Sequence, residues 1–311
     1  DYGGVERLVH VLSDEVSTPD VVGSTTEVLA KLCSEDTAVQ AVVQEVGFAS
    51  IFEVLNTTKS TDVQCQLLRL VAALGFNNRL MQEQVRRKDK LPIVVKFLYT
   101  SNFLLQEYAV RALLTLVAND HKNKDAARKA GALEGLVSML GSSKEMVVKS
   151  AVRAISEIAL SESKAKDALR KAGALEVLGG LLSTNLVVGG SIVTAKGTVM
   201  TEMVDCTLST YVLECISVVC MQNSNNQKRF ASSPTRISQV AELTTSRDLR
   251  EVYHAINAME KVARNNKKVK KEVLAHCPIL PNLLAGWAKH PDERLASLAE
   301  AASQVFPQDK E

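Results

Sequence analysis

The sequence predicts an all-α fold made of tandem helical repeats, a solenoid rather than an ordinary globular domain. One observation is that a block of residues recurs at a fixed offset of about 42 residues along most of the chain. A second is composition: hydrophobic residues make up 46% of the chain but aromatic residues only 4%, so the apolar surface is mostly Ala, Val and Leu. Only seven prolines interrupt the 311 residues, which leaves long stretches free to be helical.

The recurring block is clearest where residues 128–140 read RKAGALEGLVSML and residues 170–182 read RKAGALEVLGGLL. The same offset relates three further sets of positions: Gly47, Asp89, Gly131 and Gly173; Val63, Leu105 and Val147; and Leu74, Leu116 and Ile158. Because these sets fall on two different predicted helices of each unit, the period belongs to the whole unit and not to one motif.

Each unit is predicted to contain three helices. A short polar helix such as HKNKDAARKA ends at Gly131, because glycine readily takes the left-handed conformation that stops a helix. A second, apolar helix follows, and the polar break GSSKE leads into a longer third helix. The third helix has one apolar stripe at helical spacing: Val147, Ala151, Ala154, Ile155 and Ile158.

This pattern resembles the armadillo repeat, which has a unit near 42 residues, an AGAL junction (here residues 130–133) and small residues on its third helix. The resemblance covers nearly the whole chain and implies a right-handed α-α superhelix with about seven repeats in a single domain, 1–311. The first unit lacks its first helix and opens at Gly3, and in the last two units SSPTRIS and HCPILPN replace the glycine junction. The expected repeats are 1–36, 37–77, 78–120, 121–162, 163–223, 224–265 and 266–311.

The fifth repeat is about 19 residues too long, and the excess falls at residues 184–203. This insertion is rich in Val, Ile and Thr and contains glycine turn signals, so it predicts a β-hairpin or an extended loop. An exposed apolar loop usually docks somewhere, either on its own solenoid or on a partner, and the sequence leaves both open. Its apolar side chains are Val187, Val188, Ile192, Val193, Val199 and Met200.

In the armadillo family the third helices line a concave groove that holds other proteins, and the 42-residue phase gives the side chains that would line it here. Three of them, Arg69, Arg111 and Arg153, form a ladder at repeat spacing. Guanidinium groups can clamp a carboxylate, a phosphate or a peptide carbonyl. Alternatively, the arginines tie adjacent repeats together through Glu or Asp, or lie over apolar neighbours. The full predicted groove is Gln66, Arg69, Tyr108, Arg111, Thr115, Ser150, Arg153, Glu157, Tyr211, Glu214, His254, Asn257 and Lys261.

The sequence departs from armadillo nuclear-import receptors of the importin-α type, which grip a basic peptide with a Trp and an Asn on each third helix. The only tryptophan, Trp287, lies in the second helix of the last repeat. The arginine ladder is more similar, by charge alone, to the basic grooves of the β-catenin type, which implies an acidic partner segment. The Trp positions hold Arg69, Arg111, Arg153 and Glu214, and the Asn positions hold Ala73, Thr115, Glu157 and Val218.

Several function classes are disfavoured. The net charge is +2, which gives no general attraction to nucleic acid or membrane. Nucleotide-binding and zinc-protease motifs are absent, and no histidine lies in a catalytic pattern, so we expect no catalytic residue, metal or cofactor. The six cysteines show no metal spacing and predict buried free thiols in a reducing, cytoplasmic compartment. The run at 267–271 is interpreted as a solvated helix face rather than a localisation signal.

The leading hypothesis is a non-enzymatic scaffold or adaptor that binds an extended or helical partner segment in its groove. An alternative is a chaperone cofactor, similar to Hsp70 exchange factors or myosin chaperones, that clamps a folded domain. A third is small-molecule sensing in the groove. The longest apolar runs contain charges, so no transmembrane segment is predicted, although attachment to a membrane surface through a segment upstream of Asp1 stays open. The sequence names neither the partner nor the oligomeric state.

Overall fold

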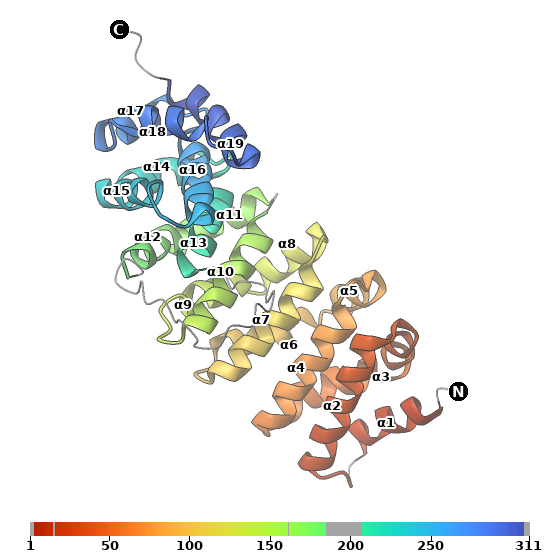
Figure 1. Ribbon diagram of the computed structural model, residues 1–311. Helices are drawn as coiled ribbons and strands as arrows, with labels where there is room; N and C mark the ends of the chain where they lie inside the picture. The colour runs from red at the N-terminus through yellow and green to blue at the C-terminus, as the bar shows by residue number, and fades with distance from the viewer. Residues whose placement is uncertain (1–2, 15, 161, 185–206, 308–311) are drawn as a thin grey trace, which may run out of the picture. The chain divides into compact units, whose positions relative to one another are not determined.

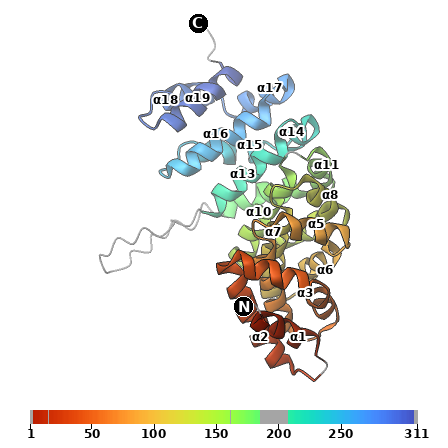
Figure 2. The same ribbon diagram turned by 90° about the vertical axis from the view of Figure 1, so that its right-hand side faces the viewer.

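The computed structural model describes residues 3–14, 16–160, 162–184 and 207–307. Within these ranges the chain is helical and contains no strand. It divides into two compact units, Asp1–Ala165 and Lys166–Glu311, each described by itself below. Figures 1 and 2 show the helices from two directions. The single domain expected from the sequence stays a prediction.

Unit 1 follows the predicted helix order. From α5 onward a short polar helix and a short apolar helix precede each long third helix. The helices are α1 (Gly3–Ser13), α2 (Pro19–Glu35), α3 (Thr37–Thr57), α4 (Thr61–Gly75), α5 (Arg79–Arg87), α6 (Leu91–Val95) with the 3-10 turn η1 (Lys96–Tyr99), α7 (Phe103–Val117), α8 (His121–Lys129), α9 (Ala132–Met139) and α10 (Glu145–Ala159).

Unit 2 continues the same order. Its helices are α11 (Ser163–Lys171), which begins in the last residues of unit 1, α12 (Ala174–Thr184), α13 (Leu208–Cys220), α14 (Ser224–Ala231), α15 (Pro234–Leu243), α16 (Leu249–Ala263), α17 (Lys267–His276), α18 (Leu280–Trp287) and α19 (Glu293–Val305).

The third helices stack side by side within each unit and form the core between them. In unit 1 these are α2, α4, α7 and α10, and in unit 2 they are α13, α16 and α19 (Figure 1). The stripe predicted on α10 is confirmed, because each of its members is at most 1% exposed: Val147, Ala151, Ala154, Ile155 and Ile158. The small alanines allow close approach of the neighbouring α7, which favours tight stacking.

The predicted glycine junctions are confirmed at two positions. Gly131 has φ of 84° and Gly173 has φ of 75°, and each lies between the first and second helices of its unit. Asp89 takes the same place with φ of 51°, so the junction keeps its left-handed geometry without glycine. Such a conformation costs a residue with a Cβ about 1 kcal/mol.

The prediction of a junction at Gly47 is wrong. Residues 37–57 form the single helix α3, and Gly47 lies in its middle. A Cβ at Gly47 would lie 3.0 Å from Cγ1 of Val9 on α1, so the glycine permits the close contact of α1 with α3. Phe48, Ile51 and Phe52 continue the buried face without a break. Periodicity placed the glycine correctly but could not distinguish a turn from a close approach.

The first and last described helices differ from the central pattern. Two helices, α1 and α2, precede α3, and α1 begins at Gly3. In the two last repeats, Pro234 and Pro281 lie in the first turns of α15 and α18, where proline is well tolerated. The repeat count of seven and the insertion stay predictions, because the insertion's apolar residues lie outside the described residues: Val187, Val188, Ile192, Val193, Val199 and Met200.

Two further features bear on environment. The five cysteines that the structure describes are free and buried: Cys33, Cys65, Cys215, Cys220 and Cys277. In the described ranges, α3 is the one helix long and apolar enough to cross a membrane by length and composition. It contains Glu45 and Glu53, and its buried residues pack against α1, α2 and α4, so core packing accounts for its hydropathy.

Candidate functional site

None of the thirteen predicted groove side chains is buried; each is exposed or half-buried. The structure distributes them over the third helices of both units. Unit 1 holds Gln66, Arg69, Tyr108, Arg111, Thr115, Ser150, Arg153 and Glu157 on α4, α7 and α10, and unit 2 holds Tyr211, Glu214, His254, Asn257 and Lys261 on α13 and α16. Their exposure is compatible with a binding role, which itself stays a prediction.

In unit 1, Arg69, Tyr108 and Arg111 line one surface pocket of about 370 Å³. The remaining wall comes from α2 and from small residues of α4, and the sequence analysis missed the α2 contribution. The repeat period could have predicted this contribution, because Glu27 lies 42 residues before Arg69, at the equivalent position of the preceding third helix. The other lining residues are Ala30, Lys31, Ser34, Glu35, Ala72 and Ala73.

Both arginines of this pocket already contact carboxylates of the chain. Arg69 Nη1 lies 3.7 Å from Oε1 of Glu27 on the preceding third helix. Arg111 Nη2 lies 2.5 Å from Oε1 of Glu107, one turn earlier on α7, and its guanidinium carbon lies 5.8 Å from the ring centre of Tyr108. The Arg69–Glu27 pair is exposed to solvent, and in the second pair Arg111 is exposed although Glu107 is only 14% exposed, so each pair contributes about 1 kcal/mol or less. A partner carboxylate can therefore compete for the arginines at small cost.

A second row, not foreseen from the sequence, ties the first helix of a repeat to its third helix. One polar side chain on the first helix reaches the end of the third helix of the same repeat. Gln40 Nε2 donates to the carbonyl of Ala73 at 2.7 Å, and Gln82 Nε2 donates to that of Thr115 at 2.8 Å. In unit 2, Lys166 Nζ donates to the carbonyl of Met221, and Gln227 Nε2 to those of Lys261 and Arg264. Polar residues at Gln40, Gln82, Lys124 and Lys166 follow the 42-residue period, which was the available signal.

In the fourth repeat the same row becomes an ion pair. Lys124 is buried and its Nζ lies 2.8 Å from Oε1 of Glu157 on α10. Glu157 occupies one of the predicted groove positions, but its carboxylate serves the contact between α8 and α10. Thr115 likewise accepts from Gln82 through its carbonyl, and its hydroxyl donates to the carbonyl of Ala112. Both residues are therefore weaker candidates for partner contact than the arginines.

In unit 2 the predicted groove residues do not gather in one pocket. His254 lines a pocket of about 330 Å³ with Leu249, Tyr253 and Leu295. Burial lowers the pKa of His254, and the nearby Glu214 carboxylate acts in the opposite direction. The amide of Asn257 donates to the hydroxyl of Ser217 at 3.3 Å, which joins α16 to α13.

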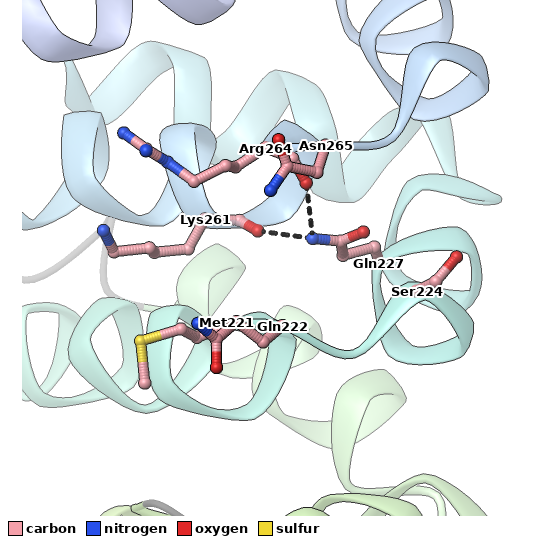
Figure 3. Close-up of a pocket in the computed structure, with 7 residues that line it drawn as sticks. All are labelled: Met221, Gln222, Ser224, Gln227, Lys261, Arg264 and Asn265. Carbon is pink, nitrogen blue, oxygen red and sulfur yellow. Dashed lines mark hydrogen bonds between the residues drawn. The ribbon is translucent and has the colours of Figure 1, made fainter.

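Lys261 lines a different pocket, of about 520 Å³, beside the turns that follow α13 and α16 (Figure 3). Its Nζ lies 2.8 Å from Oε2 of Glu260, a carboxylate that is 1% exposed and that also pairs with Arg264. The Gln227 amide donates to the carbonyls of Lys261 and Arg264, drawn as dashed lines in Figure 3. Lys261 therefore lies in a different pocket from His254.

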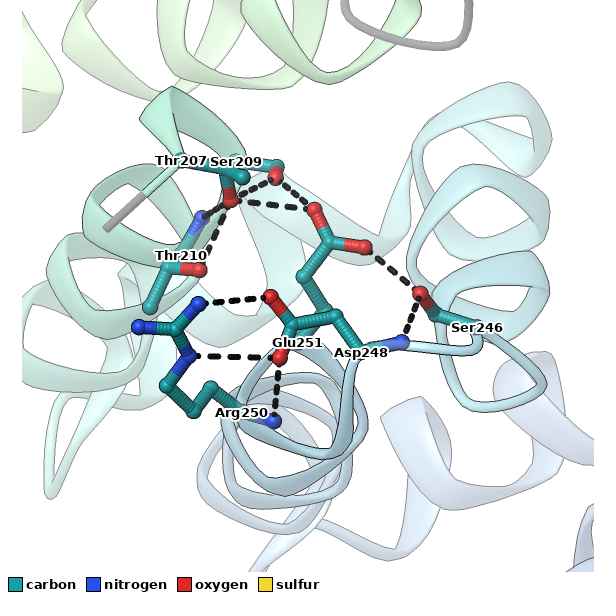
Figure 4. Close-up of polar contacts among 7 residues, drawn as sticks. All are labelled: Thr207, Ser209, Thr210, Ser246, Asp248, Arg250 and Glu251. Atoms are coloured by element: carbon teal, nitrogen blue, oxygen red, sulfur yellow. Dashed lines mark hydrogen bonds and ion pairs between the residues drawn. The ribbon is translucent and has the colours of Figure 1, made fainter. Parts of the chain in front are cut away.

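The N-terminal ends of α13 and α16 are joined by a polar network around Glu251 (Figure 4). Its carboxylate accepts hydrogen bonds from the hydroxyls of Thr207, Ser209 and Ser246. Next to it, Asp248 caps α16 and pairs with Arg250 at 3.1 Å, and Arg250 lowers the pKa of Asp248. The network holds the starts of two neighbouring third helices together. Its carboxylates and hydroxyls bond to one another and to Arg250. Within the described ranges no group of three or more His, Cys, Asp or Glu could hold a metal ion.

Comparisons with known proteins agree with this architecture. The Armadillo/beta-catenin-like repeat family matches residues 120–160, which contain α8, α9 and α10. Among solved structures, an engineered protein aligns over 98% of this chain and 69% of its own, with a TM-score of 0.84 and 21% identity. A designed armadillo repeat protein aligns over 82% of this chain and 98% of its own, with a TM-score of 0.69 and 19% identity. The chain is an armadillo-repeat solenoid.

Another designed armadillo repeat protein, solved in complex with the peptide (KR)4, is similar at 21% identity over 82% of this chain and 98% of its own, with a TM-score of 0.67. No curated protein matches the sequence. In the armadillo repeat matched by the family, the third helix α10 carries Arg153 and Glu157, so one rung of the ladder lies inside the matched segment.

Proposed function

We propose that this armadillo-repeat protein is a non-enzymatic scaffold or adaptor that holds an extended or helical segment of another protein along the third helices of unit 1. The observation that carries the proposal is the pocket shared by Arg69, Tyr108 and Arg111. It joins three consecutive third helices and combines three cations, two carboxylates, an aromatic ring and small residues. Such a mixture suits a polypeptide better than a small polar ligand.

We further propose that the bound segment is acidic. A basic peptide such as (KR)4, which is bound in the complex of the designed armadillo protein, would here meet Arg69, Arg111 and Arg153. A carboxylate would instead displace Glu107 from Arg111 or join Glu27 at Arg69, where the existing pairs are 2.5 Å and 3.7 Å long. Charge-assisted hydrogen bonds to a guanidinium then give direction and register to the bound segment.

The partner segment also meets apolar side chains. Leu104 and Met146 begin the third helices α7 and α10 at one repeat spacing and are 43% and 60% exposed. Arg111 and Arg153 lie seven residues later on the same helices, about 10 Å along the axis. An amphipathic segment with acidic residues on one edge and apolar residues on the other would satisfy both rows. A reducing, cytoplasmic setting is proposed with it, and the buried free thiols of the described residues support that setting.

The test is selection of random peptides displayed on phage by the purified protein, followed by affinity measurement with the selected peptides. Arg111→Glu is expected to weaken binding at least about tenfold, which corresponds to the loss of one charge-assisted contact. Arg87→Glu is the matched control, because Arg87 is also exposed and pairs with a Glu one turn earlier, but lies on the first helix α5. The control is expected to bind within about twofold of wild type.

Selection of basic peptides, or equal affinity of Arg111→Glu and wild type, would contradict the proposal. A chaperone cofactor that clamps a folded domain would select no peptide in this assay. Thermal melting of both variants is measured alongside, because neither exposed pair should change stability by more than about 1 kcal/mol.

A further inference from the structure

The basic residues of this chain concentrate on the first helices of the repeats and not on the third helices. Lys and Arg outnumber Asp and Glu by three to one in α5, four to one in α8, four to one in α11, two to none in α14 and four to one in α17. By contrast, the numbers are equal in each of the third helices α4, α7 and α10. The overall charge of +2 hides this separation.

In unit 2 the helices α14 and α17 pack side by side and present a cluster that we call the lysine face: Lys228, Lys267, Lys268, Lys270 and Lys271. On α17 the buried Val269 and Val273 occupy the opposite side of the helix. Lys268 lies 3.9 Å from Glu272. Among the described residues, the other four lysines pair with no carboxylate.

Folding stability does not explain this cluster. Lys267 and Lys268 lie in the first turn of α17, next to the positive end of the helix dipole, where no acidic residue is present. Cations at a helix N-terminus are unfavourable, whereas anions there are favourable. The two ammonium groups therefore do not stabilise α17 through its dipole, and of the two only Lys268 has a carboxylate nearby, that of Glu272.

The pocket of Figure 3 lies beside the lysine face. Asn265 lines the pocket, and the N-cap of α17, Asn266, donates from its side-chain amide to the hydroxyl of Ser224, another lining residue, at 3.4 Å. In Figure 3 Lys261 and Arg264 extend in the same direction from α16. They share the single carboxylate Glu260, so the wall keeps one positive charge.

The carbonyl oxygens at the end of α16, which would repel an anion, already accept hydrogen bonds within the chain. Those of Lys261 and Arg264 already accept hydrogen bonds from Gln227, at 2.9 Å and 3.1 Å. The volume of about 520 Å³ is large enough for a phosphorylated headgroup, and the lining carries amide and hydroxyl groups from Gln222, Ser224 and Asn265.

We propose that the lysine face of unit 2, with the adjoining pocket, docks on a bilayer that contains anionic phospholipids. Clusters of four to eight Lys or Arg are the usual footprint of such binding. The unpaired cations of the lysine face are all ammonium groups. An ammonium group is a point charge, which suits a diffuse layer of headgroups better than a fixed pattern of carboxylates. In addition, the turn after α17 presents Ile279, which is 58% exposed.

Nucleic acid is a poorer fit for this surface. Binding to single strands uses exposed aromatic rings as stacking platforms. Of the aromatic residues on the neighbouring helices, Phe230 is buried and Trp287 donates its Nε1–H to the carbonyl of Thr244 at 3.0 Å. Trp287 is half-buried, and Tyr253 on α16 lies in the separate pocket of His254, so no fully exposed ring is placed at the lysine face by the described residues.

The test is flotation of the full chain with phosphatidylcholine vesicles, and with vesicles in which about a third of the lipid is phosphatidylserine. Wild type is expected to float only with the anionic vesicles and to be released by high salt. The variant Lys267→Gln/Lys268→Gln/Lys271→Gln should bind them roughly a hundredfold more weakly, since each lysine near an anionic surface contributes about a factor of five to ten. Its melting temperature should be equal to or above that of wild type.

The control Arg69→Gln/Arg111→Gln/Arg153→Gln removes the same charge from unit 1 and should float like wild type. Ser224→Asp places a negative charge in the pocket at a position favourable to α14, and should weaken flotation several-fold without unfolding the chain.

The proposal is overturned if wild type floats with neither kind of vesicle, if the control loses binding as strongly as the lysine variant, or if Ser224→Asp binds like wild type. It is also overturned if poly-glutamate or RNA binds at concentrations where anionic vesicles do not. The groove arginines are intact in the lysine variant, so peptide binding is tested separately.

Discussion

The side-chain amide of Gln82 on α5 donates a 2.8 Å hydrogen bond to the carbonyl oxygen of Thr115, near the end of α7 in the same repeat. The same amide lies 3.4 Å from the carbonyl of Gly75, at the end of α4. Gln82 thus bridges the C-terminal ends of two consecutive third helices, whose last carbonyls have no partner inside their own helix. Gln40 and Gln227 in other repeats each donate to the end of one third helix, that of their own repeat.

Replacing Gln82 with leucine is expected to destabilise the protein by about 1–3 kcal/mol, because the carbonyl of Thr115 loses its side-chain donor and that of Gly75 keeps only the N–H of Asn78. The measurement is the free energy of unfolding from urea titration. Gln304→Leu is the control, since Gln304 is exposed on α19 and should change stability by less than about 0.5 kcal/mol. Equal effects of the two substitutions would show that the bridge does not contribute.

The Lys124–Glu157 pair gives a second test of the same row. Glu157→Gln leaves the buried ammonium of Lys124 without a counter-charge and should destabilise by about 1–3 kcal/mol, less than a fully buried pair because Glu157 is 31% exposed. Lys124→Gln should cost less, because glutamine at this position reaches a helix-end carbonyl in other repeats. A double-mutant cycle measures the coupling, and a value near zero would contradict an ion pair of structural importance.

Much of the fold could be predicted from this sequence because the repeat period fixes position within the unit. The buried stripe of α10 and the left-handed Gly131 both follow from it. Gly47 shows the limit of the method. A glycine is needed both where φ is positive and where another helix approaches closely, and only the position of Val9 distinguishes the two cases.

The candidate site was harder to predict for a physical reason. Phase identifies which side chains face outward, and all thirteen predicted residues do. It does not show which of them already have partners in the chain. Glu157 faces outward by phase yet is paired with Lys124, and Glu27 on α2 completes the pocket beside Arg69 on α4. Both depend on contacts between different helices, which a single period does not encode.

The left-handed junctions predict opposite effects for two substitutions at equivalent positions. Gly131→Ala should destabilise by about 1–2 kcal/mol, because φ is 84° and a Cβ would lie 3.2 Å from Oη of Tyr99. Asp89→Gly should be neutral or stabilising by up to about 1 kcal/mol, since it relieves the same strain at φ of 51°. Thermal unfolding measures both, and Gly4→Ala is a control because a Cβ there contacts nothing within 4 Å and no positive φ is involved. Stabilisation by Gly131→Ala would refute the assigned geometry.

Buried thiols make the stability of this protein fall at alkaline pH. Burial raises the pKa of Cys33 on α2 to about 12, while an unfolded thiol titrates near ~8.5. The folded state therefore holds its proton more tightly, so this contribution is fully present below about pH 8.5 and is lost as pH rises from there towards 12. At pH 10 the loss from Cys33 alone should be about 2 kcal/mol.

Urea unfolding at pH 7.5 and pH 10 measures this loss, with Cys33→Ala as the comparison. The substitution lowers stability at both values, but the difference between them should shrink. An unchanged difference would mean that the alkaline loss arises from the other buried thiols, whose pKa values are also raised, or from Tyr99.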